Sequence, residues 1–293
     1  MKRTTILLAI CLLLSFLGGC DTAAEPADIA ATTLPVYEFT ARLCEGTDIT
    51  VTRLITENVS CLHEYTLQVD QMQALESAQA VVISGAGLET FLEDALHSAK
   101  GIIDASADVE LLCAAHYHED EPGHHDHPAA DPHIWLSPEN AMKMSRNICN
   151  GLTRLYPQHE ALFSQNLQTL LVDLQALLQY GQTQLQTLSG RELITFHDGF
   201  SYFASAFDLD ILEAVEEESG SEASAEELIR FIDLTKEHQL NAVFTETNGS
   251  TSAAQIIAAE TRAHIYTLDM AMSGSSYFNA IYHNIDTIKE ALG

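Results

Sequence analysis

Histidine and acidic side chains crowd one stretch of the chain, between Cys113 and Pro138. This stretch holds six of the thirteen histidines and five acidic residues, with neither lysine nor arginine among them. Imidazole and carboxylate groups together are the donors that borderline divalent metals such as zinc prefer. The stretch therefore indicates metal ligation, and a solvated polar loop is the alternative.

The two ends of this stretch differ. The loop at 114–130 carries a biased tract, which predicts an accessory metal-collecting loop rather than a defined site, because a mobile loop cannot hold four donors in one geometry. Its histidines are His116, His118, His124, His125 and His127. His133 instead follows a proline and stands beside Trp135, just before Ser137 and Pro138, which can cap and open a helix. We predict that His133 is a fixed ligand.

Three further potential ligands stand where predicted strands end. His63 lies past a strand that ends at Ile55, His197 directly follows an apolar strand, and Asp269 directly follows another. In open α/β sheets, ligands bind beyond the carboxyl ends of the strands. We therefore predict that His63, His133, His197 and Asp269 surround one metal, a shell that suits tetrahedral zinc. Singly, each could be a loop residue, a packed histidine or a cap, and a water could replace Asp269.

Strands and helices alternate along the chain in two series. Strands are predicted at 32–37, 49–55, 80–84, 101–104, 192–196, 211–215, 242–245 and 264–268, and helices at 38–45, 69–78, 88–99, 137–156, 202–207, 224–238, 252–261 and 277–292. This alternation predicts βαβ units and parallel sheets. Between the series, a helical pattern from Pro157 to near Gly190 would span roughly 45 Å.

The predicted fold is α/β, with two lobes that each contain a parallel sheet flanked by helices. The lobes at 32–156 and 190–293 are joined by one long rigid helix at 157–189. Two of the predicted ligands come from each lobe, so the metal site is expected in the cleft between the lobes.

The start of the chain has the layout of a secretory signal peptide. Lys2 and Arg3 precede an apolar run that is too short to span a bilayer comfortably. Leu17 to Cys20 resemble the bacterial lipobox, in which the cysteine receives lipid. We expect a signal peptide at 1–19, lipidation of Cys20 and a tether at 20–31, with plain secretion as the alternative.

The net charge bears on the possible partners, and the cysteine count bears on possible disulfides. The formal net charge of -29 at pH 7 argues against binding to nucleic acid or anionic lipid and favours cations, although solubility alone is an alternative. Four cysteines follow Cys20, and an even count in an exported chain suggests disulfides. The most local pairing joins Cys44 to Cys61 and Cys113 to Cys149, and free buried thiols are the alternative.

Motifs for hydrolysis are missing from the sequence. Glu64 follows His63, but the helical H-E-x-x-H motif requires a histidine where Leu67 stands. The chain has neither a G-x-S-x-G elbow nor a phosphate-binding glycine loop. We therefore predict that the protein is no enzyme. A zinc hydrolase, the alternative, needs a vacant coordination position and a general base.

Several runs of the sequence resemble one family. The runs 131–138 and 196–203, and His63 with Glu64 and Tyr65, are similar to the three histidine motifs of the zinc-binding lipoproteins of bacterial ABC importers. That cluster also includes manganese-binding and adhesin lipoproteins. Residues 84–92 and 242–246 and the histidine-rich loop are similar to it as well, so the resemblance covers nearly all of the chain after Cys20.

The resemblance implies two lobes bridged by a rigid helix, with a metal in the cleft that is delivered to a membrane permease. Leu62 stands where several zinc members have an acidic residue, and Thr247 stands where a proline is usual. Manganese members usually have glutamate in place of His197, and the softer imidazole favours zinc. We expect a monomeric lipoprotein that captures Zn²⁺ on the outer face of the cytoplasmic membrane, periplasmic if the cell has two membranes. Manganese or broader cation binding is the alternative, and an adhesin is less favoured.

Overall fold

Two four-stranded parallel sheets form the centre of the protein. The computed structural model describes residues 27–59, 62, 65–112, 130–214 and 223–293. The first sheet has the order β2-β1-β3-β4 and the second the order β6-β5-β7-β8, with parallel pairing throughout. The strands are β1 (Ile29–Ala31), β2 (Val51–Arg53), β3 (Ala80–Ile83), β4 (Ile102–Asp104), β5 (Glu192–Thr195), β6 (Asp210–Ala214), β7 (Ala242–Glu246) and β8 (His264–Leu268). The predicted fold class is confirmed.

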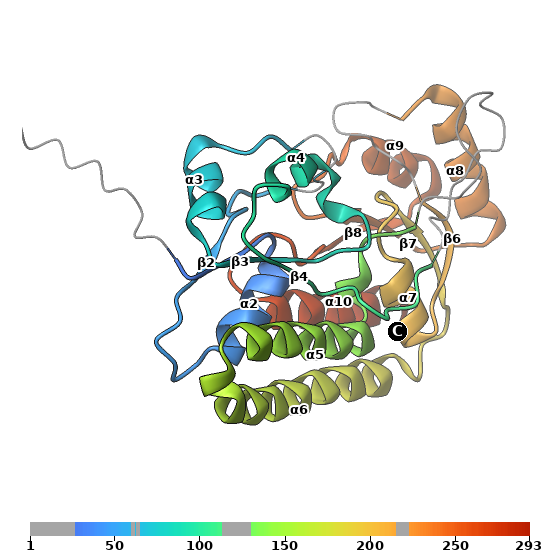
Figure 1. The fold of residues 1–293 in the computed structure, drawn as a ribbon. Coiled ribbons are helices and arrows are strands. Elements are labelled where there is room, and N and C mark those ends of the chain that lie inside the picture. Colours follow the sequence, from blue (N-terminus) through green and yellow to red (C-terminus); the bar gives the residue numbers. More distant parts are fainter. Residues whose placement is uncertain (1–26, 60–61, 63–64, 113–129, 215–222) are drawn as a thin grey trace, which may run out of the picture.

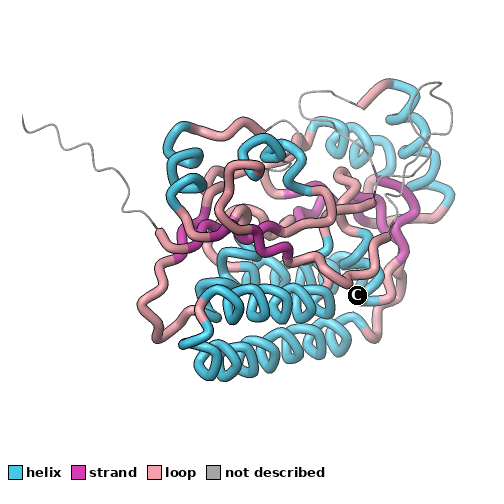
Figure 2. The backbone as a smooth tube through the Cα atoms, viewed as in Figure 1, coloured by secondary structure: helices cyan, strands magenta, loops and turns pink. Residues whose placement is uncertain are grey.

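Helices cover both faces of the strand layer. In the first half they are α2 (Leu34–Leu43), α3 (Val69–Ser77), the 3-10 turn η1 (Leu88–Leu92), α4 (Glu93–Leu96), the 3-10 turn η2 (Ile134–Leu136) and α5 (Pro138–Leu155). In the second half they are α7 (Ser201–Phe207), α8 (Ala225–Glu237), α9 (Ser252–Thr261) and α10 (Tyr277–Leu292). Figure 1 shows α3, α4, α8 and α9 on one side of the strands and α2, α5 and α10 on the other. Figure 2 shows the strands as the layer between them.

One long helix connects the two halves. A 3-10 turn, η3 (Pro157–His159), leads into α6 (Glu160–Leu185), which is 26 residues long. This helix packs against α2 and α5 of the first half and against α7 and α10 of the second, and it lies beside α5 in Figure 1. Its buried leucines recur at the spacing of one helical face, from Leu170 to Leu185. The predicted connecting helix is confirmed, although it ends at Leu185 rather than near Gly190.

Two predicted elements differ from the structure near the first sheet. The segment predicted as extended at 32–37 becomes helical from Leu34, where α2 begins, because Pro35 lies in the first turn, where a missing N–H costs no hydrogen bond. The strand lies just before it, as β1. The helix predicted at 88–99 is split into η1 and α4 with non-helical angles at Glu89. The carboxylate of Glu89 accepts hydrogen bonds from the backbone N–H groups of Ser84 and Gly85, which turns the chain back on itself.

The cysteines inside the described ranges are not cross-linked. Cys44 and Cys149 are free, buried thiols, so the predicted disulfides are absent at these two positions. Burial raises the pKa of Cys44 to about 12, which keeps the thiol protonated and inert. Cys20, Cys61 and Cys113 lie outside the described residues.

Within the part of the chain that the structure describes, every helix is too short or too polar to cross a membrane. The predicted signal peptide at 1–19 and most of the predicted tether at 20–31 lie outside the described residues. The end of that tether is wrong, because Ile29–Ala31 form the buried strand β1.

Candidate metal centre

His133 is held in place by a neighbouring carboxylate. It follows Asp131 and Pro132 and directly precedes η2, and its side chain is 4% exposed. One oxygen of Asp131, Oδ1, accepts a hydrogen bond from the His133 backbone N–H at 2.9 Å and from the ring Nδ1 at 2.8 Å. The proton on Nδ1 leaves the lone pair of Nε2 for a metal, the usual arrangement of a ligating histidine with a carboxylate behind it.

His197 comes from the other half of the protein. It stands two residues beyond β5, and its carbonyl oxygen accepts a hydrogen bond from the hydroxyl of Thr195, the last residue of that strand. Its Nδ1 lies 3.7 Å from Oε2 of Glu246, the last residue of β7, whose side chain is 8% exposed. A second carboxylate thus stands behind the second imidazole, at a longer distance.

The two imidazoles meet at their Nε2 atoms. These atoms are 3.3 Å apart, and the ring planes are nearly perpendicular, at 83°. Two nitrogens bound to one tetrahedral zinc at about 2.0–2.1 Å would lie about 3.3–3.4 Å from each other. The separation therefore matches that of two ligands on one ion.

Glycine at position 199 allows the two rings to approach. A Cβ atom there would lie 2.7 Å from the ring of His197 and 2.9 Å from Nδ1 of His133. Trp135 packs edge-on against the ring of His133, with centroids 5.4 Å apart, and its Nε1 donates a hydrogen bond to the carbonyl of Met270. The pair is thus enclosed by side chains from both halves.

Asp269 directly follows β8, as predicted, and its backbone is fixed by α10. The side chain of Asn284 accepts from the Asp269 backbone N–H and donates to its carbonyl, both at 2.7 Å. The carboxylate oxygen Oδ1 accepts from the backbone N–H of Ala271 at 2.7 Å. Asp269 therefore stabilises a turn, which was the alternative to its predicted role as a metal ligand.

The predicted four-ligand shell is only partly described. Across the described ranges, no group of three or more His, Cys, Asp or Glu side chains is arranged to hold a metal ion, so Asp269 is not gathered with the histidine pair. His63 lies outside the described residues, although its neighbours Leu62 and Tyr65 are joined by a backbone hydrogen bond. The histidines of the metal-collecting loop, from His116 to His127, also lie outside them.

The sequence did not reveal that two carboxylates, those of Asp131 and Glu246, stand behind the imidazoles of His133 and His197. Asp131 was counted only as one acidic residue of the histidine-rich stretch between Cys113 and Pro138. Glu246 was noted only as the end of the run 242–246, which resembles the family. Glu246 ends β7, so the rule that selected His197 and Asp269 at strand ends would also have selected it. Asp131 carries no comparable signal, because a two-residue spacing to a histidine does not reveal which ring atom it contacts.

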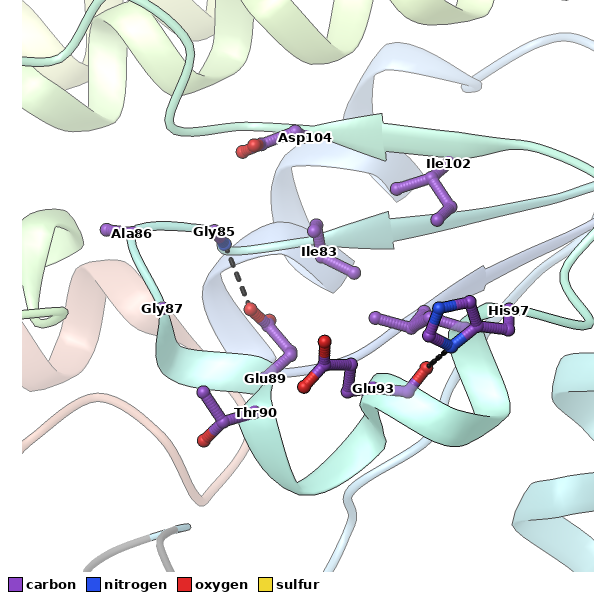
Figure 3. Close-up of a pocket in the computed structure, with 11 residues that line it drawn as sticks. Ile83, Gly85, Ala86, Gly87, Glu89, Thr90, Glu93, His97, Ile102 and Asp104 are labelled. Carbon is purple, nitrogen blue, oxygen red and sulfur yellow. Dashed lines mark hydrogen bonds between the residues drawn. The ribbon is translucent and has the colours of Figure 1, made fainter.

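A separate pocket lies in the first half, beside β3 and β4 (Figure 3). Its lining includes the carboxylates of Glu89, Glu93 and Asp104 and the imidazole of His97. Glu89 turns toward the backbone of Gly85, and Nδ1 of His97 lies 2.8 Å from the carbonyl of Glu93. The pocket offers no competing metal centre, because no three potential ligands are gathered there or elsewhere in the described ranges.

Comparison with known sequences shows which protein family this chain resembles. Residues 29–291 match the family model described as zinc-uptake complex component A, periplasmic (ZnuA). The chain is 26% identical to the high-affinity zinc uptake system protein ZnuA of Bacillus subtilis, over 98% of this chain and 94% of that protein. It is 28% identical to the zinc-binding lipoprotein AdcA of Streptococcus pneumoniae, and it spans 61% of that longer protein.

Comparison with solved structures gives the same answer. A crystal structure of ZnuA superposes with a TM-score of 0.80 at 30% identity, covering 92% of this chain and all of the other. The laminin-binding protein of Streptococcus agalactiae, described as having adhesin and metal-transporting activity, has a TM-score of 0.79 at 21% identity, which shows a common fold. Since the family model spans almost all of the described chain, this protein belongs to the periplasmic zinc-uptake component A family, the ZnuA family.

Proposed function

We propose that this protein captures Zn²⁺ between its two halves, with Nε2 of His133 and Nε2 of His197 as ligands. The observation that carries the proposal is the 3.3 Å separation of these two atoms, since it matches two ligands on one tetrahedral ion. Membership of a zinc-uptake family supports the same ion. Carboxylates behind both rings would hold their orientation and increase their basicity.

The remaining positions of the shell are assigned to His63 and Asp269. His63 follows β2 in the chain, and Asp269 follows β8, so each belongs to the end of a sheet from which ligands are usually drawn. The Asp269 carboxylate would have to move to reach the two imidazoles, because the structure does not gather it with them and its Oδ1 accepts from the backbone N–H of Ala271. A closed shell of four protein ligands would leave no position for a reactive water, which disfavours hydrolysis and supports a binding role.

Zinc is favoured over manganese by the donor set. Both ligands proposed from the structure are imidazoles, which suit zinc better than the harder oxygen donors that manganese prefers. Manganese remains the alternative ion, since the chain is 26% identical to the manganese-binding lipoprotein MntA of Halalkalibacterium halodurans. A competitive titration of both ions against a chelator decides between them. Tighter binding of manganese would overturn the assignment of zinc.

The captured ion would be passed to the permease of an ABC importer. Family membership supports this partner, and the lipobox-like sequence that ends at Cys20 supports export and attachment to the membrane. We expect the protein to be a monomer. The change Cys20→Ala should release the protein from the membrane fraction without altering zinc binding. A Cys20→Ala protein that still sediments with membranes would contradict lipidation at this residue.

The histidine-rich loop is proposed as an accessory collector rather than as part of the main site. Its flanks are tied together outside the loop, because the backbone N–H of Asp131 donates to the carbonyl of Leu112 at 2.9 Å. Deletion of residues 117–128 should therefore leave one tight zinc and remove only weaker ones. Calorimetric titration measures both, and loss of the tight zinc would refute this division.

A further inference from the structure

The hydroxyl of Tyr202 joins the two halves directly behind His133. Tyr202 lies in the first turn of α7, five residues after His197, and its side chain is buried. Its hydroxyl donates a hydrogen bond to the carbonyl of Asp131 at 3.1 Å and accepts one from the backbone N–H of Leu112 at 2.9 Å. One side chain of the second half thus holds two separate segments of the first.

These hydrogen bonds form a closed ring. Besides its bond to Tyr202, Leu112 accepts from the backbone N–H of Asp131 through its own carbonyl. Both backbone groups of Asp131 are therefore used, which fixes the peptide planes on either side of this residue. Asp131 itself is 1% exposed, so water has little access to replace a lost partner.

The orientation of Asp131 in turn sets that of His133. A single carboxylate oxygen of Asp131 receives both the backbone N–H and the ring Nδ1–H of His133. A rotation of the Asp131 backbone would move this oxygen away from one or both donors. The ring of His133 would then lose the contact that directs its Nε2 toward His197.

We propose that Tyr202 is a positioning residue for zinc capture: through the carbonyl of Asp131 it holds His133 in the ring orientation that faces His197. Because Tyr202 and His197 belong to the same short segment around the start of α7, the distance between the two ligands is set across the boundary between the halves. This inference rests on the proposed function for its zinc readout, but the orientation of the His133 ring can be measured without metal.

The test compares two tyrosines whose hydroxyls do similar work. Tyr277 is also buried, and its hydroxyl donates to the carbonyl of Trp135 at 2.9 Å across the same boundary. The variants Tyr202→Phe and Tyr277→Phe each remove one buried hydroxyl and keep the aromatic ring. Circular dichroism confirms that each folds, and the melting temperature reports the structural loss in each case.

Two readouts separate positioning from stability. Zn²⁺ affinity is measured by competition with a chelator, and the Nδ1–H proton of His133 is observed by NMR of the metal-free, histidine-labelled protein. Tyr202→Phe should weaken zinc binding about 10-fold, the lower end for loss of an outer-shell partner, and its Nδ1–H should exchange rapidly with water. Tyr277→Phe should melt at about the same temperature as Tyr202→Phe, but it should keep the wild-type zinc affinity and the wild-type Nδ1–H signal of His133.

Other outcomes would overturn the proposal. If Tyr202→Phe keeps both the affinity and the slow-exchanging proton, its hydroxyl does not position His133. If Tyr277→Phe loses as much zinc affinity as Tyr202→Phe, the effect belongs to general stability. A wild-type protein that binds no zinc would instead refute the proposed function, and the proton signal would still decide the role of Tyr202.

Discussion

The two halves of this protein share one strand order but present their histidines in different ways. In the first half, His133 directly precedes η2, well after the last strand of its sheet in the chain, with its ring 2.8 Å from Asp131. In the second half, His197 follows the central strand β5, with its ring 3.7 Å from Glu246. Its side chain is 12% exposed, against 4% for His133. We infer that the first imidazole is oriented before a metal arrives and that the second retains freedom to adjust.

The difference shows that the same strand order does not place the same side chains near the two histidines. The third strand in each sheet order ends near a buried glutamate, yet the two glutamates act differently. Glu89 turns back onto Thr32, Ser84 and Gly85 and closes the end of β3. Glu246, at the end of β7, faces the ring of His197. The two halves therefore differ in where the glutamate lies, since Glu246 is the last residue of β7 whereas Glu89 lies in η1, beyond the end of β3.

Removal of either imidazole should cause the largest loss of zinc affinity, because each half would then lack its histidine ligand. His133→Ala and His197→Ala should each weaken zinc binding by more than about 100-fold, beyond the range for outer-shell changes. Competitive titration measures the loss, and circular dichroism verifies the fold. A His197→Ala protein that binds one zinc as tightly as the wild type would remove this residue from the site.

Glutamate substitutions should separate the two positions sharply. His197→Glu should shift the preference toward manganese, because it supplies a harder oxygen donor. His133→Glu should instead lose both ions, since it would place a second carboxylate against the buried Asp131. Titration of each variant with zinc and with manganese measures the preference. Equal behaviour of the two variants would show that the halves are equivalent.

Removing the carboxylate charge behind each imidazole should weaken zinc binding more where the carboxylate lies closer to the ring. Asp131→Asn should weaken zinc binding about 10-fold, as expected for an outer-shell partner in direct contact with a ligand. Glu246→Gln should have a smaller effect, because its oxygen lies farther from the ring. Both variants preserve side-chain size. A larger loss for Glu246→Gln would reverse the inferred order of orientation.

Changes at Asp269 test whether the second half supplies a further ligand. Asp269→Asn keeps an oxygen that can accept from Ala271 but removes the charge, so it should weaken zinc binding several-fold if the carboxylate is a ligand. Asp269→Ala should also lose about 1 kcal/mol of stability with the hydrogen bond. Parallel zinc titration and urea unfolding measure the two effects. Wild-type zinc affinity in Asp269→Asn would assign Asp269 to the turn alone.

The smallest effect on zinc is expected at Glu89, which should alter stability instead. Burial raises its pKa from 4.5 to about 7, against the effect of hydrogen bonds from Thr32, Ser84 and Gly85. Between these values the folded state binds more protons than the unfolded state, so this contribution to stability is full below the unfolded value and is lost as pH rises through about 7.

Glu89→Gln cannot ionise and should therefore remove that part of the pH dependence. Urea unfolding of both proteins at several pH values measures the difference in free energy, which should change between about pH 4.5 and pH 7. Zinc affinity should remain that of the wild type. A difference that does not vary with pH would show that Glu89 is not protonated in this range.

The sequence predicted the fold better than the detail of the site. Hydrophobic periodicity was sufficient for α6, and the helix predicted at 224–238 agrees with α8, whose start is stabilised by a capping box of Ser224 with Glu227. The split at Glu89 was missed because it depends on a side chain that reaches back to its own loop. Likewise, the strand-end rule found His197, but the contact between Asp131 and His133 depends on a ring rotation that no spacing reveals.

The most direct test of the account is a crystal structure of the zinc-loaded protein with anomalous data at the zinc edge. We predict one ion between the halves, about 2.0–2.1 Å from Nε2 of both His133 and His197, with Asp131 still in contact with Nδ1 of His133. An ion bound to only one of these imidazoles, or located away from both, would contradict the central claim.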